Sequence, residues 1–371
     1  MSGNDTNQVK TRVHLAPSLD YGGLETQLTT LGTEYNKTGR TNTVEFWSLR
    51  TGGISEIKLR KLGFTVRVLN ANFRTMNPAL VLKLVYLFRK AGVNEVFTHG
   101  FESNLNGIIA ARLAGIRCVI AEEIGISKHK HLLHFAFKLN YMFVKKMSVQ
   151  SQQMKISIEK SNEISLKKVV VIYPPVEIDR ILRQDRQLSS GALKFVFIGR
   201  LEKVKNLNLM LESLYRLKNQ NKISNWTLNI YGSGSEAKNL QELVLKLDLQ
   251  TNIAFKGMTN AALEAISEAD WMLLSSESEG FGLVIIESML CGVPVISTKV
   301  GIAEEIIISN KNGYLSPDHS INSYLNCLLN VFTMTNNDYR NISNEAISSA
   351  KGRFNSEAYL MELDKLVEPA N

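Results

Sequence analysis

Short apolar segments rich in β-branched residues alternate along this chain with longer amphipathic segments. The short segments have the length of strands, and the longer ones repeat their apolar positions with the period of helices. Such alternation predicts parallel sheets covered by helices, which is the α/β class. We expect a first series of strands at residues 12–16, 43–48, 65–70, 95–98, 117–121 and 168–172, and a second series at residues 194–198, 227–231, 252–255, 271–275 and 294–298.

Amphipathic segments between the strands predict the helices. They lie at residues 78–91, 104–114, 207–217, 236–247 and 261–267, with further helices after Asn310. The break between the two series, marked by Tyr173-Pro174-Pro175 and a polar tract at residues 183–191, is the best linker, because consecutive prolines continue neither a helix nor a strand ladder. A length of 371 residues suits two domains. We expect these at residues 1–185 and 186–352, with a C-terminal helix in residues 353–371 packing back on the first domain.

Residues 279–287 read Glu-Gly-Phe-Gly-Leu-Val-Ile-Ile-Glu and predict a ligand-binding loop followed by a buried helix. Gly280 and Gly282 allow the backbone to approach a ligand closely. The helix is expected to begin at Leu283, and its amino end would attract phosphate or sugar oxygens. Glu279 and Glu287 can accept hydrogen bonds from vicinal hydroxyls, which favours a sugar or a ribose. The helix dipole alone also favours a carboxylate near a helix start, so a purely structural role stays open.

Two cations follow the first strand of the second series. Arg200 comes directly after Gly199 at the end of that strand, and Lys205 stands at the start of the next helix. Ligands of open parallel sheets bind beyond the carboxyl ends of the strands. An arginine that can bind in bidentate fashion and a lysine point charge suit a diphosphate whose charge grows as a bond to it breaks.

Glycine turns and one histidine also follow strand ends. Gly232 and Gly234 end the second strand of the second series, and Gly22 and Gly23 link the first strand of the chain to its first helix. A Gly-x-Gly turn such as Gly232-Ser233-Gly234 is weak evidence by itself, but beside the first loop it offers a close backbone approach to a ligand. A simple tight turn explains Gly22 and Gly23 nearly as well as ligand contact does. His99 follows the strand at residues 95–98, where it could hydrogen-bond a sugar hydroxyl or the reacting oxygen, or be a structural residue.

The net charge of +8 is unevenly distributed. Residues 1–185 hold 26 Lys plus Arg against 15 Asp plus Glu, a net +11, and the remainder carries −3. The first half alone is therefore expected to meet an anionic surface or substrate, unless its surface is basic only for solubility. The polar start and the lack of long apolar runs predict a cytosolic protein, and Cys118, Cys291 and Cys327 are expected to be reduced core residues.

Residues 128–146 are basic, aromatic and amphipathic. This segment could lie on an anionic bilayer or form a helix whose apolar side packs in the core, and core packing is the preferred interpretation. Both can hold if only its polar edge and one aromatic side chain touch lipid.

Several chemistries have no motif in the chain. It contains no Asp-x-Asp, no His-Glu-x-x-His and no Cys or His cluster, so no metal is expected to hold a diphosphate. It also lacks Gly-x-Ser-x-Gly and a Walker loop, which argues against an acyl hydrolase or an ATP-driven machine. No nucleic-acid partner is expected.

Together these motifs resemble the retaining family-4 glycosyltransferases of the GT-B fold, from about Val13 to the C-terminal helix. Gly199-Arg200 with Lys205-Asn206 looks like the family's phosphate-binding motif, and Tyr231-Gly232-Ser233-Gly234 like its Gly-x-Gly turn. Residues 276–287 look like its Glu-x7-Glu block, which Gly292-Val293-Pro294-Val295-Ile296 continues. Gly22, Gly23 and His99 match family positions on fewer residues.

The resemblance implies two Rossmann-like, doubly wound domains that face a central cleft. It implies a nucleotide sugar, UDP-linked by expectation, with Arg200 and Lys205 on the diphosphate, Glu279 on the sugar and Glu287 on the ribose. Amides of Phe281, Gly282 and Leu283 would hold sugar hydroxyls or phosphate. His99, Arg200, Lys205 and Glu279 become the expected catalytic residues, without a cofactor or a metal.

Two departures from the family pattern concern residues near the sugar and base sites. Ser275-Ser276 stands where many members have Pro-Ser, which is a minor change. Ala303-Glu304-Glu305 stands where Pro-Glu is frequent, which leaves open which of Glu304 and Glu305 contributes to the donor site.

The predicted function is transfer of a sugar, with retention of configuration, to a glycan or lipid-linked saccharide in bacterial surface polysaccharide or lipopolysaccharide synthesis. The basic first domain would then work at the inner face of the cell membrane. A non-hydrolysing sugar-nucleotide epimerase of the same architecture is the main alternative. A non-catalytic carbohydrate or membrane-surface binding protein is less favoured, since it would need no diphosphate ligands.

Overall fold

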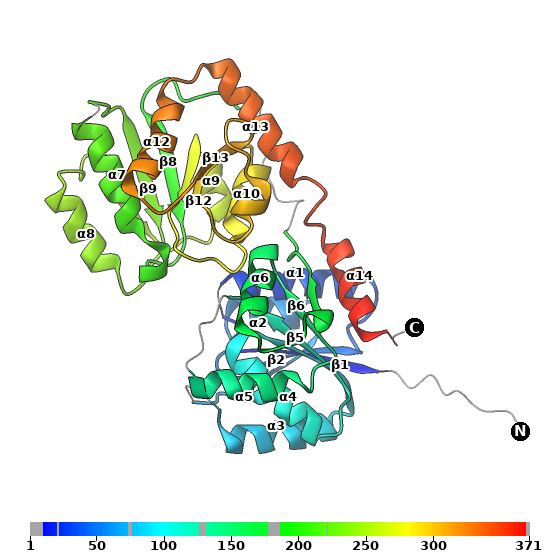
Figure 1. Ribbon diagram of the computed structural model, residues 1–371. Helices are drawn as coiled ribbons and strands as arrows, with labels where there is room; N and C mark the ends of the chain where they lie inside the picture. Colours follow the sequence, from blue (N-terminus) through cyan, green and yellow to red (C-terminus); the bar gives the residue numbers. More distant parts are fainter. Residues whose placement is uncertain are drawn as a thin grey trace, which may run out of the picture. The chain divides into compact units, whose positions relative to one another are not determined.

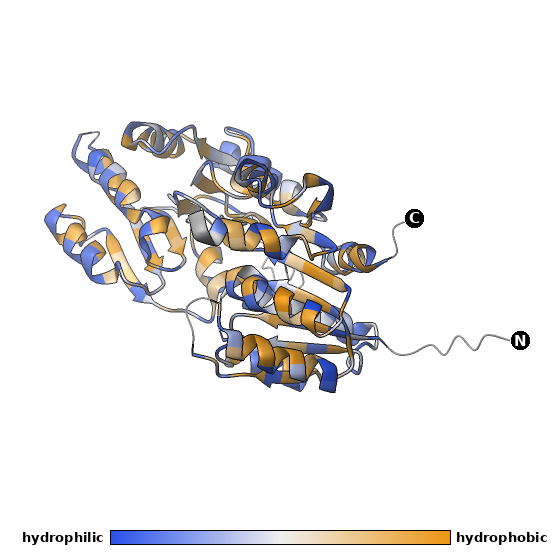
Figure 2. Cartoon of the chain, turned by 60° about the horizontal axis from the view of Figure 1, so that its bottom comes forward, coloured by the Kyte–Doolittle hydropathy of each residue, from blue (hydrophilic) through white to orange (hydrophobic). Residues whose placement is uncertain are grey.

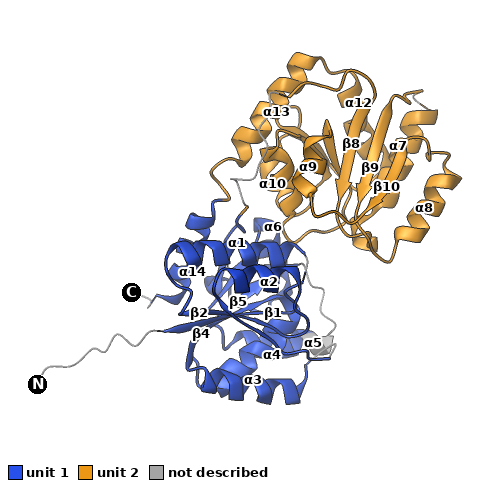
Figure 3. Ribbon diagram, turned by 180° about the vertical axis from the view of Figure 1, so that it is seen from behind, with its two compact units in different colours: residues 1–175, 355–371 blue, residues 176–354 orange. Residues whose placement is uncertain are grey.

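The computed structural model describes residues 10–20, 22–72, 76–125, 131–176, 186–220 and 222–368, with the side chains of residues 131–133 left out. The polar N-terminal start, residues 128–130 of the basic segment and residues 183–185 of the expected linker lie outside this part. The chain forms two compact units, shown in Figure 3. Unit 1 comprises Met1–Pro175 and Asn355–Asn371, and unit 2 comprises Val176–Phe354.

Unit 1 is built on a parallel sheet with the strand order β3-β2-β1-β4-β5-β6-β7 (Figure 1). The order reverses between β1 and β4, as in doubly wound folds. Its strands are β1 (Thr11–Ala16), β2 (Val44–Ser48), β3 (Thr65–Val68), β4 (Val93–His99), β5 (Cys118–Glu123), β6 (Lys146–Val149) and β7 (Val169–Val171).

Helices cover both faces of this sheet. Side chains of α3, α4 and α5 belong to one apolar cluster, and those of α1, α2 and α14 belong to another. Local signals set their starts, for example Asn77, whose side chain accepts from two amides of the first turn of α3, with proline next to it. The helices are α1 (Gly23–Lys37), α2 (Ile54–Lys61), α3 (Pro78–Lys90), α4 (Gly100–Leu113), α5 (His131–Tyr141), α6 (Gln152–Ser161) and α14 (Ser356–Val367).

Unit 2 repeats the plan with a parallel sheet of order β10-β9-β8-β11-β12-β13. Every residue of β11 and β12 is buried, the pattern of strands covered on both faces. The strands are β8 (Leu193–Ile198), β9 (Trp226–Tyr231), β10 (Ile253–Gly257), β11 (Trp271–Leu274), β12 (Val295–Thr298) and β13 (Gly313–Ser316). The helices are α7 (Leu207–Asn219), α8 (Ala237–Lys246), α9 (Ala262–Ser267), α10 (Leu283–Leu290), α11 (Ala303–Ile306), α12 (Ile321–Phe332) and α13 (Asn336–Ala350).

The predicted α/β class and the two series of strands are confirmed, but two strands were missed. The sequence favoured a single helix over residues 128–146, but α5 already ends at Tyr141. Strand β6 begins at Lys146, the last residue of that segment. Strand β13 lies in the region after Asn310 where only helices were expected, and it is too short for its alternation to stand out.

The units divide earlier than the sequence predicted. Unit 2 begins at Val176, whereas the expected second domain begins at residue 186, and the Val176 amide donates to the Phe354 carbonyl at 3.0 Å within unit 2. Phe354 therefore belongs to unit 2, and the returning segment begins at Asn355 rather than at residue 353. As expected, α14 returns to unit 1, where Tyr359, Leu360 and Leu363 join its core.

A buried polar chain runs through the α14 side of unit 1. Arg12 of β1 donates to Glu95 of β4 at 2.9 Å, to the Tyr35 hydroxyl of α1 at 2.9 Å and to Asp364 of α14 at 2.7 Å. Arg40 also reaches Asp364, at 2.7 Å. Because the Arg12 and Glu95 side chains are 9% and 10% exposed, each charge depends on its partner. The C-terminal helix is thus fixed to the sheet by charge as well as by its apolar side.

Histidines continue this chain toward the carboxyl end of β4. His14 Nε2 lies 3.0 Å from the Tyr35 hydroxyl, and His14 Nδ1 lies 2.9 Å from His99 Nε2. The ring of His14 is fully buried between Phe46 and Phe97. Burial first, and then the charges of His99 and Arg12, hold the pKa of His14 well below its ordinary value of 6.5. His14 is therefore neutral at physiological pH.

We predict that unit 1 loses stability as the pH falls below about 6.5. Below that pH the unfolded chain binds a proton at His14 that the folded chain does not, so each further pH unit removes up to about 1.4 kcal/mol. Calorimetric unfolding at pH 7.5 and 5.5 measures the loss. In His14→Phe, which keeps an aromatic ring in place, the pH dependence should shrink. In His319→Gln, at an exposed position of unit 2, it should be unchanged; equal slopes in all three proteins would contradict the assignment.

Candidate functional site

The loop between β8 and α7 carries both predicted cations. Gly199 and Arg200 follow β8 directly, and Arg200 is exposed. A single 3-10 turn, Lys203–Lys205, then leads into α7. Asn206 caps this turn in the left-handed conformation, with φ of 46°, a region in which asparagine is less strained than most residues. The reversal brings Lys205 back toward the carboxyl end of the sheet.

Lys205 forms an ion pair with Glu279, which lies in the loop between β11 and α10. The Lys205 Nζ lies 2.5 Å from Glu279 Oε1, and the two side chains are 16% and 10% exposed. The Ser276 hydroxyl donates to the same carboxylate oxygen at 2.6 Å. The cation predicted for the diphosphate and the carboxylate predicted for the sugar are thus direct neighbours.

Backbone contacts hold these two loops in register. The Ser275 hydroxyl donates to the Lys205 carbonyl at 3.1 Å, and the Glu277 amide donates to the Val204 carbonyl at 2.8 Å. Strands β8 and β11 are neighbours at the point where the strand order reverses. Ligands of doubly wound sheets bind at this point.

The Gly-x-Gly turn after β9 packs against the first of these loops. A Cβ on Gly232 would lie 1.9 Å from the Gly199 carbonyl oxygen, and a Cβ on Gly234 would lie 2.3 Å from the Leu201 carbonyl oxygen. Any larger residue would therefore push the loops apart. The close approach that these glycines permit is made to a neighbouring loop, and their contact with a ligand stays a prediction.

The start of α10 matches the sequence prediction, with its first residue at Leu283. Gly282 caps it at φ of 94°, a conformation that favours glycine. The Ile302 amide donates to the Phe281 carbonyl at 2.8 Å, and the Phe281 ring is buried against Phe354. Only the backbone of Phe281 is therefore placed to meet a ligand. The first amides of a helix have no acceptor within it, which suits phosphate or hydroxyl oxygens.

The other carboxylates that the sequence singled out for the donor site differ in their exposure to solvent. Glu287 is half-buried on α10, just over one turn from the helix start. Glu304 is exposed and Glu305 is half-buried, both on the short helix α11. The choice between Glu304 and Glu305 stays open, and the contact of Glu287 with a ribose stays a prediction.

Gly22 of unit 1 is the N-cap of α1 and Gly23 is the first residue of that helix, in the predicted link between β1 and α1. The Glu25 carboxylate sits against this turn, because a Cβ on Gly22 would lie 2.5 Å from its Oε2 atom. The Ser18 hydroxyl donates to the other carboxylate oxygen at 2.5 Å. Glu25 was not singled out from the sequence, where it is an ordinary acidic residue of a first helical turn.

His99 ends β4 as predicted, but its ring is bonded on both sides within unit 1. It is 1% exposed, its Nε2 faces His14 Nδ1, and its Nδ1 donates to the Glu122 carboxylate. Glu122 also accepts from Gln27 at 2.9 Å. Burial raises the pKa of Glu122, and the hydrogen bond and charge of His99 outweigh it to give a lowered pKa. The sequence left open whether His99 contacts a substrate or is a structural residue; this structure gives both ring nitrogens protein partners.

The structure therefore assembles the predicted residues in two groups. Unit 2 joins the Arg200 loop, the Gly232 turn and the Glu279 loop through hydrogen bonds and close backbone contacts. Unit 1 holds Gly22, Gly23 and His99 at the carboxyl ends of neighbouring strands. Sequence reasoning missed Ser276, although its place three residues before Glu279 in one loop was the available signal.

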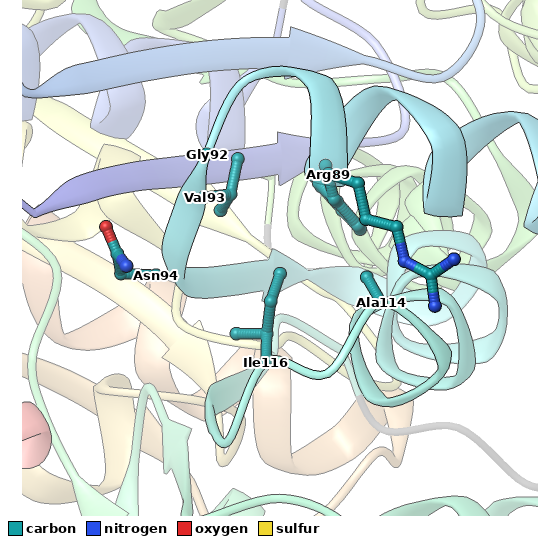
Figure 4. A pocket seen from close by; sticks show the side chains of 7 residues that line it. Arg89, Gly92, Val93, Asn94, Ala114 and Ile116 are labelled. Atoms are coloured by element: carbon teal, nitrogen blue, oxygen red, sulfur yellow. The ribbon is translucent and has the colours of Figure 1, made fainter.

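One pocket lies at the opposite end of the unit 1 sheet, at the amino end of β4 (Figure 4). Its volume is about 410 Å³. Since β4 runs from Val93 to His99, this pocket is remote from the motif loops of unit 1. It is lined by Phe88, Arg89, Gly92, Val93, Asn94, Ala114 and Ile116.

The described residues contain neither a metal-binding cluster nor a membrane-spanning helix. Within residues 10–368 and outside their gaps, no group of three or more His, Cys, Asp or Glu side chains could hold a metal ion. No helix in the same part of the chain is long and apolar enough to cross a membrane.

Sequence relatives of this chain are glycosyltransferases. Residues 179–348 match the family model for glycosyl transferases group 1. The uncharacterized glycosyltransferase MJ1059 of Methanocaldococcus jannaschii is 32% identical over 284 residues, 67% of this chain and 69% of the relative. UDP-Gal:alpha-D-GlcNAc-diphosphoundecaprenol alpha-1,3-galactosyltransferase of Escherichia coli is 25% identical over 68% of this chain and 69% of its own length.

A shorter match and a solved structure complete the comparison. N-acetyl-alpha-D-glucosaminyl L-malate synthase of Bacillus anthracis is 31% identical over 36% of this chain, which spans only 34% of that relative's length. The crystal structure of HepE from Anabaena, in complex with UDP and glucose, superposes with a TM-score of 0.80 at 19% identity, over 96% of this chain and 98% of HepE. The predicted GT-B fold is thereby confirmed. By its identity with MJ1059 over two thirds of both chains, this chain belongs to the family of glycosyl transferases group 1.

Proposed function

We propose that this glycosyltransferase moves a hexosyl residue from a UDP-linked sugar to a hydroxyl of a glycan or lipid-linked saccharide, with retention of configuration. The observation that carries the proposal is the Lys205–Glu279 pair beside Arg200, at the point where the unit 2 strand order reverses. The UDP and glucose in HepE and the diphosphoundecaprenol acceptor named for the Escherichia coli relative support the two substrate classes.

In this proposal the donor lies on unit 2. Arg200 and Lys205 hold the diphosphate, Glu279 accepts from sugar hydroxyls and Glu287 accepts from the ribose. Amides of Phe281, Gly282 and Leu283 contact sugar or phosphate oxygens, and the backbones of Gly199, Gly232 and Gly234 shape the loop beside them. The sequence also predicted Gly22 and Gly23 of unit 1 as donor-binding residues.

The proposed reaction needs no protein nucleophile. The bond between the anomeric carbon and the diphosphate oxygen breaks, and the acceptor oxygen bonds to the same face of that carbon. The acceptor proton passes to the leaving diphosphate, whose growing charge Arg200 and Lys205 stabilise. Glu279 is suited to orient the sugar, because Lys205 and Ser276 already fix its carboxylate. The proposed catalytic role of His99 requires that one of its ring nitrogens releases its protein partner, His14 or Glu122, and binds the substrate instead.

The proposed setting is the cytoplasm, at the inner face of the cell membrane, in bacterial surface polysaccharide or lipopolysaccharide synthesis. The relative that acts on a diphosphoundecaprenol-linked sugar supports it. The comparisons give no support to the alternative of a sugar-nucleotide epimerase, since the matched relatives described above are transferases or synthases.

We predict that Lys205→Ala and Glu279→Gln each lower kcat/KM for sugar transfer by about a hundredfold or more, as loss of a preorganised charge contact does. Release of UDP from a panel of UDP-sugars, with a glycan or lipid-linked acceptor, measures the rate.

Matched controls stand in the same loops. Lys203→Ala and Glu277→Gln change exposed residues beside the two targets and should leave kcat/KM within about twofold. A thermal unfolding scan shows whether each variant is folded. Turnover like that of the native chain in either folded target variant would remove the donor assignment.

We also predict that transfer needs no divalent metal, because Arg200 and Lys205 supply the positive charge at the diphosphate. Activity should persist after treatment with a chelator. Loss of activity on chelation followed by recovery with magnesium would contradict this part of the proposal alone.

A further inference from the structure

Helices α3, α4 and α5 form one layer on unit 1, with α4 in contact with both neighbours. Large apolar side chains are exposed along this layer, which Figure 2 brings forward and colours by hydropathy. They are Met76, Leu82, Tyr86, Leu113, Phe135, Leu139, Met142 and Phe143. We call this surface the α3–α5 face.

The segment that the sequence left ambiguous presents apolar side chains on two sides. Phe137 and Tyr141 of α5 are buried in the core. Phe135 and Leu139 of α5 lie one turn apart and are 60% and 46% exposed, and Met142 just beyond the helix is 67% exposed. Core packing therefore accounts for one side of α5 and leaves the other uncovered within unit 1.

Exposed cations are interspersed with these apolar side chains. Lys90 lies over the Tyr86 ring at 5.8 Å, and Arg112 lies over the Phe143 ring at 5.7 Å. This layer has further exposed cations at Lys83, Arg89 and Lys138. Alternating aromatic, aliphatic and cationic groups are typical of protein surfaces that enter the headgroup region of a bilayer.

The sequence segments that form and flank helices α3 and α5 contain almost no carboxylates. Residues 57–94 and 124–158 contain no Asp or Glu. Between them, Glu95 binds Arg12, Glu102 binds Arg50 and Glu122 binds His99, while Glu123 accepts from Asn104 and Tyr141. Glu163, which lies 3.1 Å from His134 of α5, is buried as well. Each of these acidic groups is thus engaged inside unit 1, in contacts with groups other than Lys83, Lys90 and Lys138 of the α3–α5 face.

We propose that the α3–α5 face docks unit 1 onto an anionic lipid bilayer, with Leu82, Phe135 and Met142 entering the headgroup boundary and the cations contacting lipid phosphates. Charge complementarity decides for an anionic lipid, and the exposed aliphatic side chains distinguish a bilayer from a soluble polyanion. The proposed docking involves no residue of the donor site, so its test is independent of the test of the transfer reaction.

Co-sedimentation of the full chain with vesicles tests this docking. Vesicles of phosphatidylcholine alone and of phosphatidylcholine with phosphatidylglycerol are compared at low and at physiological salt. We expect binding to the anionic vesicles that weakens with salt, and little binding to the neutral ones. Phe135→Ser with Met142→Ser should lower the partition coefficient by about tenfold or more, and Lys90→Gln with Lys138→Gln by about tenfold.

Matched double variants control for general surface changes. Ile57→Ser with Met361→Ser removes apolar side chains of similar exposure from α2 and α14, and Lys246→Gln with Lys256→Gln removes two exposed cations from unit 2. Both should bind vesicles like the native chain. Light scattering without lipid reports self-association, and thermal unfolding reports folding.

Three results would overturn the proposal: no binding to anionic vesicles at low salt, equal binding to both vesicle types, or α3–α5 variants that bind like the native chain. A dimer that Phe135→Ser with Met142→Ser dissociates, in a chain that binds no vesicles, would assign the face to a second copy of the chain instead.

Discussion

The ion pair between Lys205 and Glu279 is the contact on which the arrangement of the candidate site depends. It joins the loops after β8 and β11, which are neighbours where the strand order of unit 2 reverses. Since both side chains are largely buried, removing one partner would leave an uncompensated charge, at a cost of about 3–5 kcal/mol. Ser276 adds a hydrogen bond to the same carboxylate, and the Gly232 turn fits against the first loop only because it lacks a side chain.

Unit 1 uses buried polar contacts in a different way. One chain of hydrogen bonds extends from Arg12 through Tyr35 and His14 to His99 and Glu122. The same groups tie α14 to the sheet, because Asp364 binds Arg12 and Gln27 donates to both Glu122 and Tyr359. The position of His99 is therefore coupled to the docking of the C-terminal helix. The opposite helical layer of this sheet contains the α3–α5 face.

The sequence predicted the fold well because parallel strands and their helices carry strong periodic patterns. It also placed Arg200, Lys205 and Glu279 in loops beyond strand ends, where glycines and charges are typical of ligand loops in such folds. It missed β6 and β13, which are four-residue strands without clear alternation. The partners of His99 and the pairing of Glu279 with Lys205 could not be predicted, because these groups come from distant strands and loops whose side chains meet only in the folded chain. The sequence likewise could not show which apolar side chains of α5 are buried and which are exposed, because this depends on how the helix packs.

We propose above all that unit 2 binds the diphosphate of a nucleotide sugar through Arg200 and Lys205 and the sugar through Glu279. A crystal structure of the chain with a bound UDP-sugar tests this binding most directly. We expect diphosphate oxygens within hydrogen-bond distance of the Arg200 and Lys205 side chains, and a sugar hydroxyl donating to Glu279. A nucleotide bound away from the β8–α7 and β11–α10 loops would contradict it.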